Sequence, residues 1–314
     1  MKINPWSLFW RQGHSTTFGD YYKQGYEGAV AEWWQSKVDA LTADSVVLEA
    51  GCGNCSLLPG LIASGIKARY IGVDLASVDI STVASEGLAE STIEVVLHPE
   101  TPIEEIPETD SSVDLVASVF GIEYSNLDKS FPEVLRVLKP DGRFSALLHH
   151  TDSVVTGMSA RALEEYNDAD LQETIRALSI ISEERDKTPS LAELKTNAAA
   201  EQSRKIINRL AEKYLSDTDP KTANATMFEF MTNALKFFKM MGASSEERRN
   251  FISSLAFEHQ ASNERFRQMV AVAFDDSGIE ELKVTLRSLG FSGVRADVIH
   301  TDGKVLAWEL YTEK

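Results

Sequence analysis

The feature that most constrains the fold is a series of short apolar runs that alternate with helix-like stretches between residues 41 and 150. The apolar runs cover residues 45–50, 69–73, 93–97, 113–119 and 142–148. Short buried strands separated by helices are typical of a parallel sheet whose crossover helices cover both faces. We therefore predict an α/β fold for this part of the chain.

A long helical region interrupts this alternation, and the chain then returns to strands. Helical periodicity covers residues 160–186, 191–215, 223–241 and 245–274, and again 279–289. Residues 293–300 and 304–311 read as two strands joined by Thr301-Asp302-Gly303, and Asp-Gly favours a tight hairpin turn. This hairpin would add antiparallel strands at one edge of the parallel sheet.

Three regions follow from this order of elements. Residues 1–40 are rich in aromatic side chains and are expected to form a helical lid. Residues 41–150 and 277–314 are expected to form the sheet domain, and residues 151–276 an inserted helical cap that handles substrate. The apolar stretch at 223–241 could line a cavity, but burial in a core or in a homodimer interface is the simpler interpretation.

Composition excludes several classes of function. The 31 basic and 48 acidic side chains give a formal charge of −17, which disfavours nucleic acid and anionic membranes as partners. Only two cysteines are present, too few for a disulfide framework, which indicates a reducing compartment. No apolar stretch is long enough to span a membrane, and the first residues do not look like a signal peptide. We expect a cytoplasmic protein.

A glycine loop follows the first predicted strand. Its sequence is Gly51-Cys52-Gly53-Asn54-Cys55-Ser56, and glycines between a strand and a helix let a ligand approach the backbone closely. A dinucleotide fingerprint would have glycine at the sixth position, where this chain has Ser56, and Glu49 would repel a pyrophosphate. Asp74, at the end of the second strand, is placed to hold ribose hydroxyls. The pattern favours a ribose-containing ligand other than NAD.

Four segments together resemble the class I S-adenosylmethionine-dependent methyltransferases. They are Val47-Leu48-Glu49-Ala50-Gly51-Cys52-Gly53, Gly72-Val73-Asp74-Leu75, residues 112–118 and residues 133–143. The resemblance covers about half of the chain and implies a Rossmann-like, seven-stranded sheet of the methyltransferase type, with an antiparallel C-terminal hairpin strand. It also implies S-adenosyl-L-methionine as the cofactor and no metal.

The resemblance also implies roles for individual residues. The backbone of Gly51, Cys52 and Gly53 would pass under the methionine part of the cofactor, and Glu49 would lie near its amino group. Asp74 would hold the ribose. The remaining implied contacts are Leu75, Ile103 and Thr101 at the adenine, and Ser118 near the methionine carboxylate. Cys55 stands where the family usually has a third glycine.

Candidate catalytic residues follow the fourth and fifth strands. Glu123 could orient or deprotonate a nucleophile, or it could be a solvated or capping acid. His149 or His150 could accept a proton from the methyl acceptor, or be a buried structural histidine. Because adjacent strand residues point to opposite faces, at most one of the two histidines is expected to face the site.

The aromatic N-terminal region has two interpretations. Tyr21, Tyr22 or Tyr26 could close over the cofactor, and we assign Tyr22 to cofactor binding on this basis. Alternatively, Trp33 and Trp34 could anchor a helix that simply packs on the sheet. Both interpretations can hold at once.

These observations predict an enzyme that transfers a methyl group from S-adenosylmethionine to an oxygen or nitrogen of a small molecule. A helical insertion after the fifth strand would roof the site and favour a small acceptor. The alternatives are a protein or peptide methyltransferase, or a redox protein that uses Cys52 and Cys55 as a Cys-x-x-Cys pair. A homodimer through the helical insertion is a further expectation.

Overall fold

The computed structural model describes residues 4–19, 25–78, 87–219 and 221–314. It divides into two compact units. The first, which we call the sheet unit, contains residues up to 158 and from 268 to the C-terminus, and the second, the helical unit, contains residues 159–267. The division falls inside two helices, α5 (Val154–Glu165) and α10 (Ser245–Ala271).

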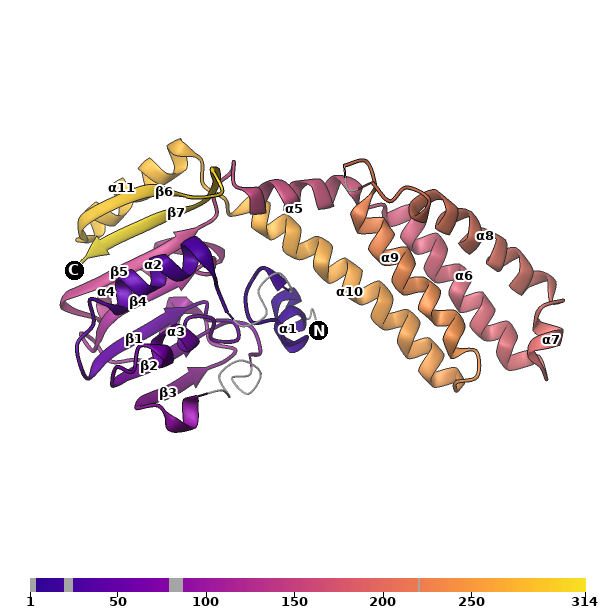
Figure 1. Cartoon of the computed structure of the whole chain (residues 1–314), viewed down its shortest axis with the longest axis horizontal. Helices are drawn as coiled ribbons and strands as arrows, with labels where there is room; N and C mark the ends of the chain where they lie inside the picture. Colours follow the sequence, from indigo (N-terminus) through magenta and orange to yellow (C-terminus); the bar gives the residue numbers. More distant parts are fainter. Residues whose placement is uncertain (1–3, 20–24, 79–86, 220) are drawn as a thin grey trace. The chain divides into compact units, whose positions relative to one another are not determined.

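The sheet unit is built on seven strands in the order β3-β2-β1-β4-β5-β7-β6 (Figure 1). Their bounds are β1 Ser45–Ala50, β2 Ala68–Val73, β3 Ile93–His98, β4 Val113–Val119, β5 Leu138–Leu148, β6 Ser292–Thr301 and β7 Lys304–Glu313. The first five pair in parallel, whereas β7 is antiparallel to both β5 and β6. The predicted Rossmann-like mixed sheet with an antiparallel hairpin is confirmed.

The hairpin turn also has the predicted form. Asp302 and Gly303 both have positive φ, 49° and 73°, the combination that Asp-Gly supplies to a tight turn between antiparallel strands. The turn places β7 between β5 and β6, so the last strands of the chain complete the sheet.

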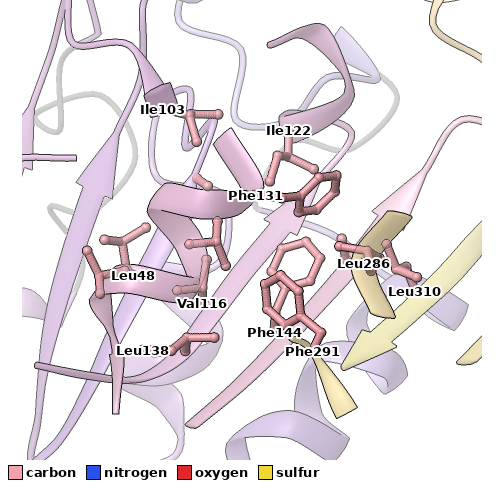
Figure 2. Packing of buried hydrophobic residues seen from close by; sticks show 14 of the residues in the cluster. Leu48, Ile103, Val116, Ile122, Phe131, Leu138, Phe144, Leu286, Phe291 and Leu310 are labelled. Carbon is pink, nitrogen blue, oxygen red and sulfur yellow. The ribbon is translucent and has the colours of Figure 1, made fainter. Parts of the chain in front are cut away.

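Helices cover both faces of the sheet because successive apolar side chains of its strands project to opposite faces. On one face, Leu48 and Val116 pack with α4 (Leu127–Val137) and α11 (Asp276–Leu289), as Figure 2 shows around Phe131, Phe144 and Leu286. On the other face, Val47 packs with α2 (Gly28–Val38) and α3 (Leu58–Ala63). Burial on both faces leaves the strand ends as the places where polar side chains gather.

Short elements complete the sheet unit. They are α1 (Pro5–Arg11) and the 3₁₀ helices η3 (Leu88–Glu90), η4 (Ile103–Glu105) and η5 (Ile122–Tyr124). Asn4 caps α1 by accepting a hydrogen bond from the Trp6 backbone N–H at 3.0 Å, as short polar side chains do at helix starts.

The helical unit has a core of its own. Its elements include α6 (Asp168–Lys187), α7 (Leu191–Leu194), α8 (Ala198–Leu215), α9 (Ala225–Leu235) and η6 (Lys236–Met240). Met227, Phe230, Met231 and Phe237 are fully buried in this core, which supports the packing interpretation of the apolar stretch at 223–241. Within the described ranges, no helix is both long and apolar enough to cross a bilayer.

Two helices predicted as continuous are interrupted. The stretch 160–186 breaks between α5 and α6 because Asn167 caps α6, with its side-chain oxygen accepting from the Asp170 N–H at 3.0 Å. The stretch 191–215 breaks before α8 because Asn197 accepts from the Ala200 N–H at 3.0 Å. Asparagine favours helix starts over helix interiors because its side chain competes for backbone N–H groups.

Candidate active site

The glycine loop lies at the carboxyl end of β1 and cannot carry larger residues at its two glycines. Gly51 and Gly53 have φ of 72° and 51°, values that glycine adopts without steric cost. A Cβ atom on Gly51 would lie 2.7 Å from the Cα of Gly121, and one on Gly53 would collide with the indole of Trp10. The loop therefore packs tightly against the end of β4 and against α1.

Cys55 keeps the backbone conformation of a third glycine. Its φ is 61°, in the left-handed region that costs an L-residue roughly 1–2 kcal/mol. Both cysteines are buried and form no disulfide, and burial together with the neighbouring Cys55 raises the pKa of the Cys52 thiol well above its usual range. A thiol held in its neutral form is a poor nucleophile.

Asp74 links the end of β2 to the glycine loop. Its Oδ2 accepts a hydrogen bond from the Gly53 N–H and its Oδ1 accepts one from the Ala76 N–H, both at 2.7 Å. Burial raises the pKa of Asp74 to about 6, although the two N–H groups act in the opposite direction. Beside it, the Leu75 side chain is 62% exposed. Asp74, predicted to hold the ribose, and Leu75, predicted to contact the adenine, thus lie side by side at the carboxyl end of β2.

Glu49 is saturated by partners inside the protein. It accepts hydrogen bonds from Ser56 Oγ at 2.9 Å, from the Leu57 N–H at 3.3 Å and from the Tyr70 hydroxyl. Burial raises its pKa to about 8, against the effect of these donors. Tyr70 could not be predicted as a partner of Glu49, which it reaches because β1 and β2 are adjacent. Glu49 therefore holds the end of the glycine loop in place through Ser56 and Leu57.

The other predicted cofactor contacts lie around this loop with their hydroxyls engaged. Ser118 Oγ donates to the Ala50 carbonyl at 2.7 Å and accepts from the Ile122 N–H at 2.9 Å. The Thr101 N–H donates to the Asp74 carbonyl at 2.9 Å, and its Oγ1 donates to the Pro99 carbonyl at 3.1 Å. Ile103 begins η4 and is buried. Tyr22 and Tyr21 lie outside the described residues.

A second polar group, formed by Glu123, Tyr124 and His149, lies at the carboxyl ends of β4 and β5. Glu123 Oε1 accepts from the His149 N–H at 3.1 Å, and His149 Nε2 lies 2.9 Å from the Tyr124 hydroxyl. Glu123 Oε2 and His149 Nδ1 are buried and have no hydrogen-bond partner among the described residues. Burial raises the pKa of Glu123 to about 8 and lowers that of His149 to about 3.

His150 has different surroundings, as strand alternation predicts. Its ring stacks on Trp308 with centroids 4.7 Å apart, and its Nδ1 accepts from the Asp152 N–H at 2.9 Å. The structure therefore brings His149, but not His150, together with Glu123.

Aromatic side chains surround this second polar group. Phe120, which has φ of 52°, stacks on His149 at 4.7 Å. Trp6 of α1 packs edge-on against Tyr124 at 5.3 Å, and Phe18 packs edge-on against Phe120 at 5.6 Å. Sequence reasoning did not single out Trp6 or Phe120 for the site, and their only signal was membership of an aromatic-rich segment and a position after a strand.

The other residues of the N-terminal region bear on its two interpretations, a lid over the cofactor and a helix packed on the sheet. Tyr26 lies 3.2 Å from the Thr17 Oγ1, and burial raises the pKa of its hydroxyl. Trp33 and Trp34 are buried in the core between α2 and the sheet, which supports a packing helix.

In the described part of the chain, no three His, Cys, Asp or Glu side chains are grouped as metal ligands would be.

Comparison with known proteins identifies the segment that carries this geometry. A profile of the methyltransferase domain family matches residues 48–146. This segment is a class I S-adenosylmethionine-dependent methyltransferase domain. S-adenosylmethionine is accordingly the cofactor that the domain implies.

Relatives of this methyltransferase domain share only part of the chain. A malonyl-[acyl-carrier protein] O-methyltransferase of Methylovorus sp. (strain MP688) is 34% identical over 109 residues, 32% of this chain and 35% of that protein. An uncharacterized methyltransferase of Schizosaccharomyces pombe is 29% identical over 142 residues, 45% and 53% of the two chains. The chain thus spans about a third to a half of the length of these relatives.

Among solved structures, a SAM-dependent methyltransferase from Aquifex aeolicus aligns over 90% of this chain and 88% of its own, with 12% identity and a TM-score of 0.39.

Proposed function

We propose that the protein transfers a methyl group from S-adenosylmethionine to an oxygen or nitrogen atom of a small molecule. The observation that carries the proposal is the pair of buried, unpartnered polar atoms, Glu123 Oε2 and His149 Nδ1, beside a methyltransferase glycine loop. Buried polar groups are nearly always hydrogen-bonded in folded proteins, so two exceptions at one strand edge suggest that a ligand supplies the partners.

The residues at the ends of β1 and β2 fit this cofactor. Asp74 offers a carboxylate for ribose hydroxyls, exposed Leu75 offers an apolar surface for adenine, and the glycines leave the loop backbone without side chains. When bound, the cofactor supplies an activated methyl carbon, so the protein's own work is to position the acceptor, exclude water and remove a proton.

Glu123 is the better candidate for proton removal. A general base works best when its pKa is near the operating pH, and the pKa of Glu123 is about 8 whereas that of His149 is about 3. His149 would then stay neutral and position the acceptor, with its Nε2 held at the Tyr124 hydroxyl. The surrounding rings of Phe120 and Trp6 would exclude water.

The decisive experiment measures binding and turnover separately. We expect S-adenosylhomocysteine to bind the wild-type chain and Glu123→Gln with the same affinity in calorimetry. With labelled S-adenosylmethionine and a panel of small alcohols, phenols and amines, Glu123→Gln should lose about a hundredfold in turnover. Absence of cofactor binding at millimolar concentration, or undiminished turnover in Glu123→Gln, would refute the proposal.

A protein-borne acceptor is the second candidate. It is favoured by the relative named as a malonyl-[acyl-carrier protein] O-methyltransferase, whose acceptor is attached to a protein. Comparing free acids with carrier-bound acyl groups in the same assay separates the two. The redox alternative has little physical support, because the Cys52 thiol is buried and its pKa is raised. We therefore expect Cys55→Ser to keep the activity of the wild type.

We also propose that residues 151–276 select the acceptor. Most of this segment forms a compact unit with its own apolar core, and such an insertion can vary without changing the cofactor loop. The homodimer through this segment stays a prediction that light scattering can check, and a cytoplasmic location likewise stays a prediction.

A further inference from the structure

A cavity of about 320 Å³ lies in the sheet unit at the end of the sheet opposite the glycine loop. It is lined at the starts of β1, β4 and β5 by residues that include Ser45, Leu115 and Arg143. Helix α2 and the hairpin strands complete it with Lys37, Arg295 and Tyr311. None of these residues belongs to the methyltransferase site described above.

Strand register places the polar lining of the cavity on one face. Ser145 of β5 pairs with Tyr311 of β7, and Tyr311 pairs with Arg295 of β6. Directly paired residues project to the same side of a sheet, and so do residues two apart on one strand. Arg143, two residues before Ser145, therefore shares this face, and it pairs in register with Glu313 of β7.

These two arginines differ from the other charged groups around the cavity. Lys37 is paired with Glu309 at 2.6 Å, and Asp114 is paired with Lys139 at 2.7 Å. Arg143 and Arg295, by contrast, form no ion pair with any described residue. In a chain with 17 more acids than bases, two arginines without an ion pair around one cavity are unusual.

The Tyr311 ring holds Arg295 in place without neutralising its charge. The Arg295 guanidinium lies over the Tyr311 ring, 4.2 Å from its centroid, which orients a cation without removing its charge. The Tyr311 hydroxyl is directed to Glu313, to which it donates at 2.6 Å. The acid Asp141 also lines the cavity, which reduces the positive charge around it. The remaining charge suits one small anion rather than a polyanion.

The floor of the cavity holds an unused hydroxyl. Ser145 is fully buried, and its Oγ has no hydrogen-bond partner among the described residues. A buried hydroxyl without a partner is unusual and is expected to be satisfied by a bound molecule. This observation is independent of the arginines and points to the same cavity.

We propose that this cavity binds the carboxylate or phosphate group of a small anion. Guanidinium groups match the planar or tetrahedral oxygens of such anions with paired hydrogen bonds. Arg143 and Arg295 would hold the charge from two sides, and the Ser145 hydroxyl would donate to one oxygen. The site is separate from the cofactor loop, so it would bind an anion in addition to the cofactor.

Calorimetry with inorganic phosphate and with acetate tests the proposal on the full chain, at ionic strength held constant with chloride. We expect at least one anion to bind, about tenfold more weakly in Arg143→Gln or Arg295→Gln and about threefold more weakly in Ser145→Ala. Binding of acetate alone identifies a carboxylate site, and binding of phosphate alone a phosphate site. Arg176→Gln, the same charge change at an exposed position of α6, is the matched control.

The proposal is overturned if neither anion gives a saturable signal up to about 10 mM, or if Arg176→Gln weakens binding as much as the two cavity variants do. Circular dichroism of every variant keeps a folding defect from being mistaken for lost binding. Affinity for S-adenosylhomocysteine should be the same in all of them, so failure here leaves the proposed methyl transfer untouched.

Discussion

The two polar groups at the carboxyl edge of the sheet differ in how their buried acids are satisfied. Glu49, behind the glycine loop, accepts from three donors and leaves no oxygen unused. Glu123, after β4, has one oxygen on the His149 N–H and the other without a partner in the described chain. Burial raises the pKa of both to about 8. Equal burial and unequal hydrogen bonding distinguish an acid that supports the fold from one that is available to a ligand.

The largest effect that this contrast predicts is on stability at Glu49. Glu49→Ala leaves the Tyr70 and Ser56 hydroxyls and the Leu57 N–H without an acceptor, and each unsatisfied donor costs roughly 1–3 kcal/mol. We expect urea unfolding to show a loss of about 4 kcal/mol in the free energy of unfolding. Glu49→Gln, which keeps an acceptor oxygen, is the control and should lose less. A loss below about 1 kcal/mol for the alanine variant would mean that Glu49 does not support the loop.

The next effect concerns Asp74, which joins the glycine loop to β2. Asp74→Ala removes the acceptor for the Gly53 and Ala76 N–H groups and the proposed ribose carboxylate. We expect S-adenosylhomocysteine to bind at least about a hundredfold more weakly, close to 3 kcal/mol, as measured by calorimetry. Far-ultraviolet circular dichroism should remain that of the wild type. Undiminished affinity would place the ribose elsewhere.

A smaller predicted effect is that the free energy of unfolding falls as the pH rises. Both glutamates have a folded-state pKa near 8 against an ordinary value of 4.5, so the folded chain holds protons that the unfolded chain has released. This stability is present at low pH and is lost as the pH rises towards 8. Between pH 6.5 and 8, each carboxyl should lower the free energy of unfolding by up to about 1.4 kcal/mol per pH unit.

Urea titrations at pH 6.5 and 8 measure this slope. The lowered pKa values of His149, about 3, and His259, about 4, act with the opposite sign; their effect lies mostly below pH 6.5, so it opposes this slope only at the low end of the window. Glu123→Gln and Glu49→Gln should each remove part of the slope. A slope equal to that of the wild type in both variants would contradict the assignment of protonated carboxyls.

The smallest expected effect is on the stability of Glu123→Gln at neutral pH. The amide keeps an oxygen for the His149 N–H, and no donor depends on Oε2 in the described structure. We expect a change below about 1 kcal/mol in the free energy of unfolding, measured beside Glu49→Ala under the same conditions. Destabilisation as large as that of Glu49→Ala would remove the distinction between the two acids.

Much of the sheet unit could be predicted from the sequence because its signals are local. The strand before Gly51, the acid at Asp74 and the Asp-Gly turn at 302–303 are each readable within a few residues. The contacts of Tyr70 with Glu49 and of Trp10 with Gly53 could not be predicted, because they join segments that are brought together only by the fold. Strand alternation predicted that His149 and His150 diverge, but not which of them meets Glu123.

In the helical unit the periodic signal was strong, but it did not reveal two breaks inside the predicted helices. Residues 160–186 and 191–215 satisfy the helical period throughout, yet Asn167 and Asn197 restart the helix by capping. A single asparagine in an otherwise helical stretch is compatible with a surface position or a cap. Only the backbone N–H that it meets decides between them.

The position of β7 between β5 and β6 sets an order of events during synthesis. The whole helical unit, residues 159–267, leaves the ribosome after β5 and before residues 304–313, which pair with β5. Until then the edge of β5 is an open template for strand pairing, while the continuous helical unit can already fold. The nascent chain therefore carries an exposed strand edge through about half of its synthesis, which makes this the interval when a chaperone would matter most.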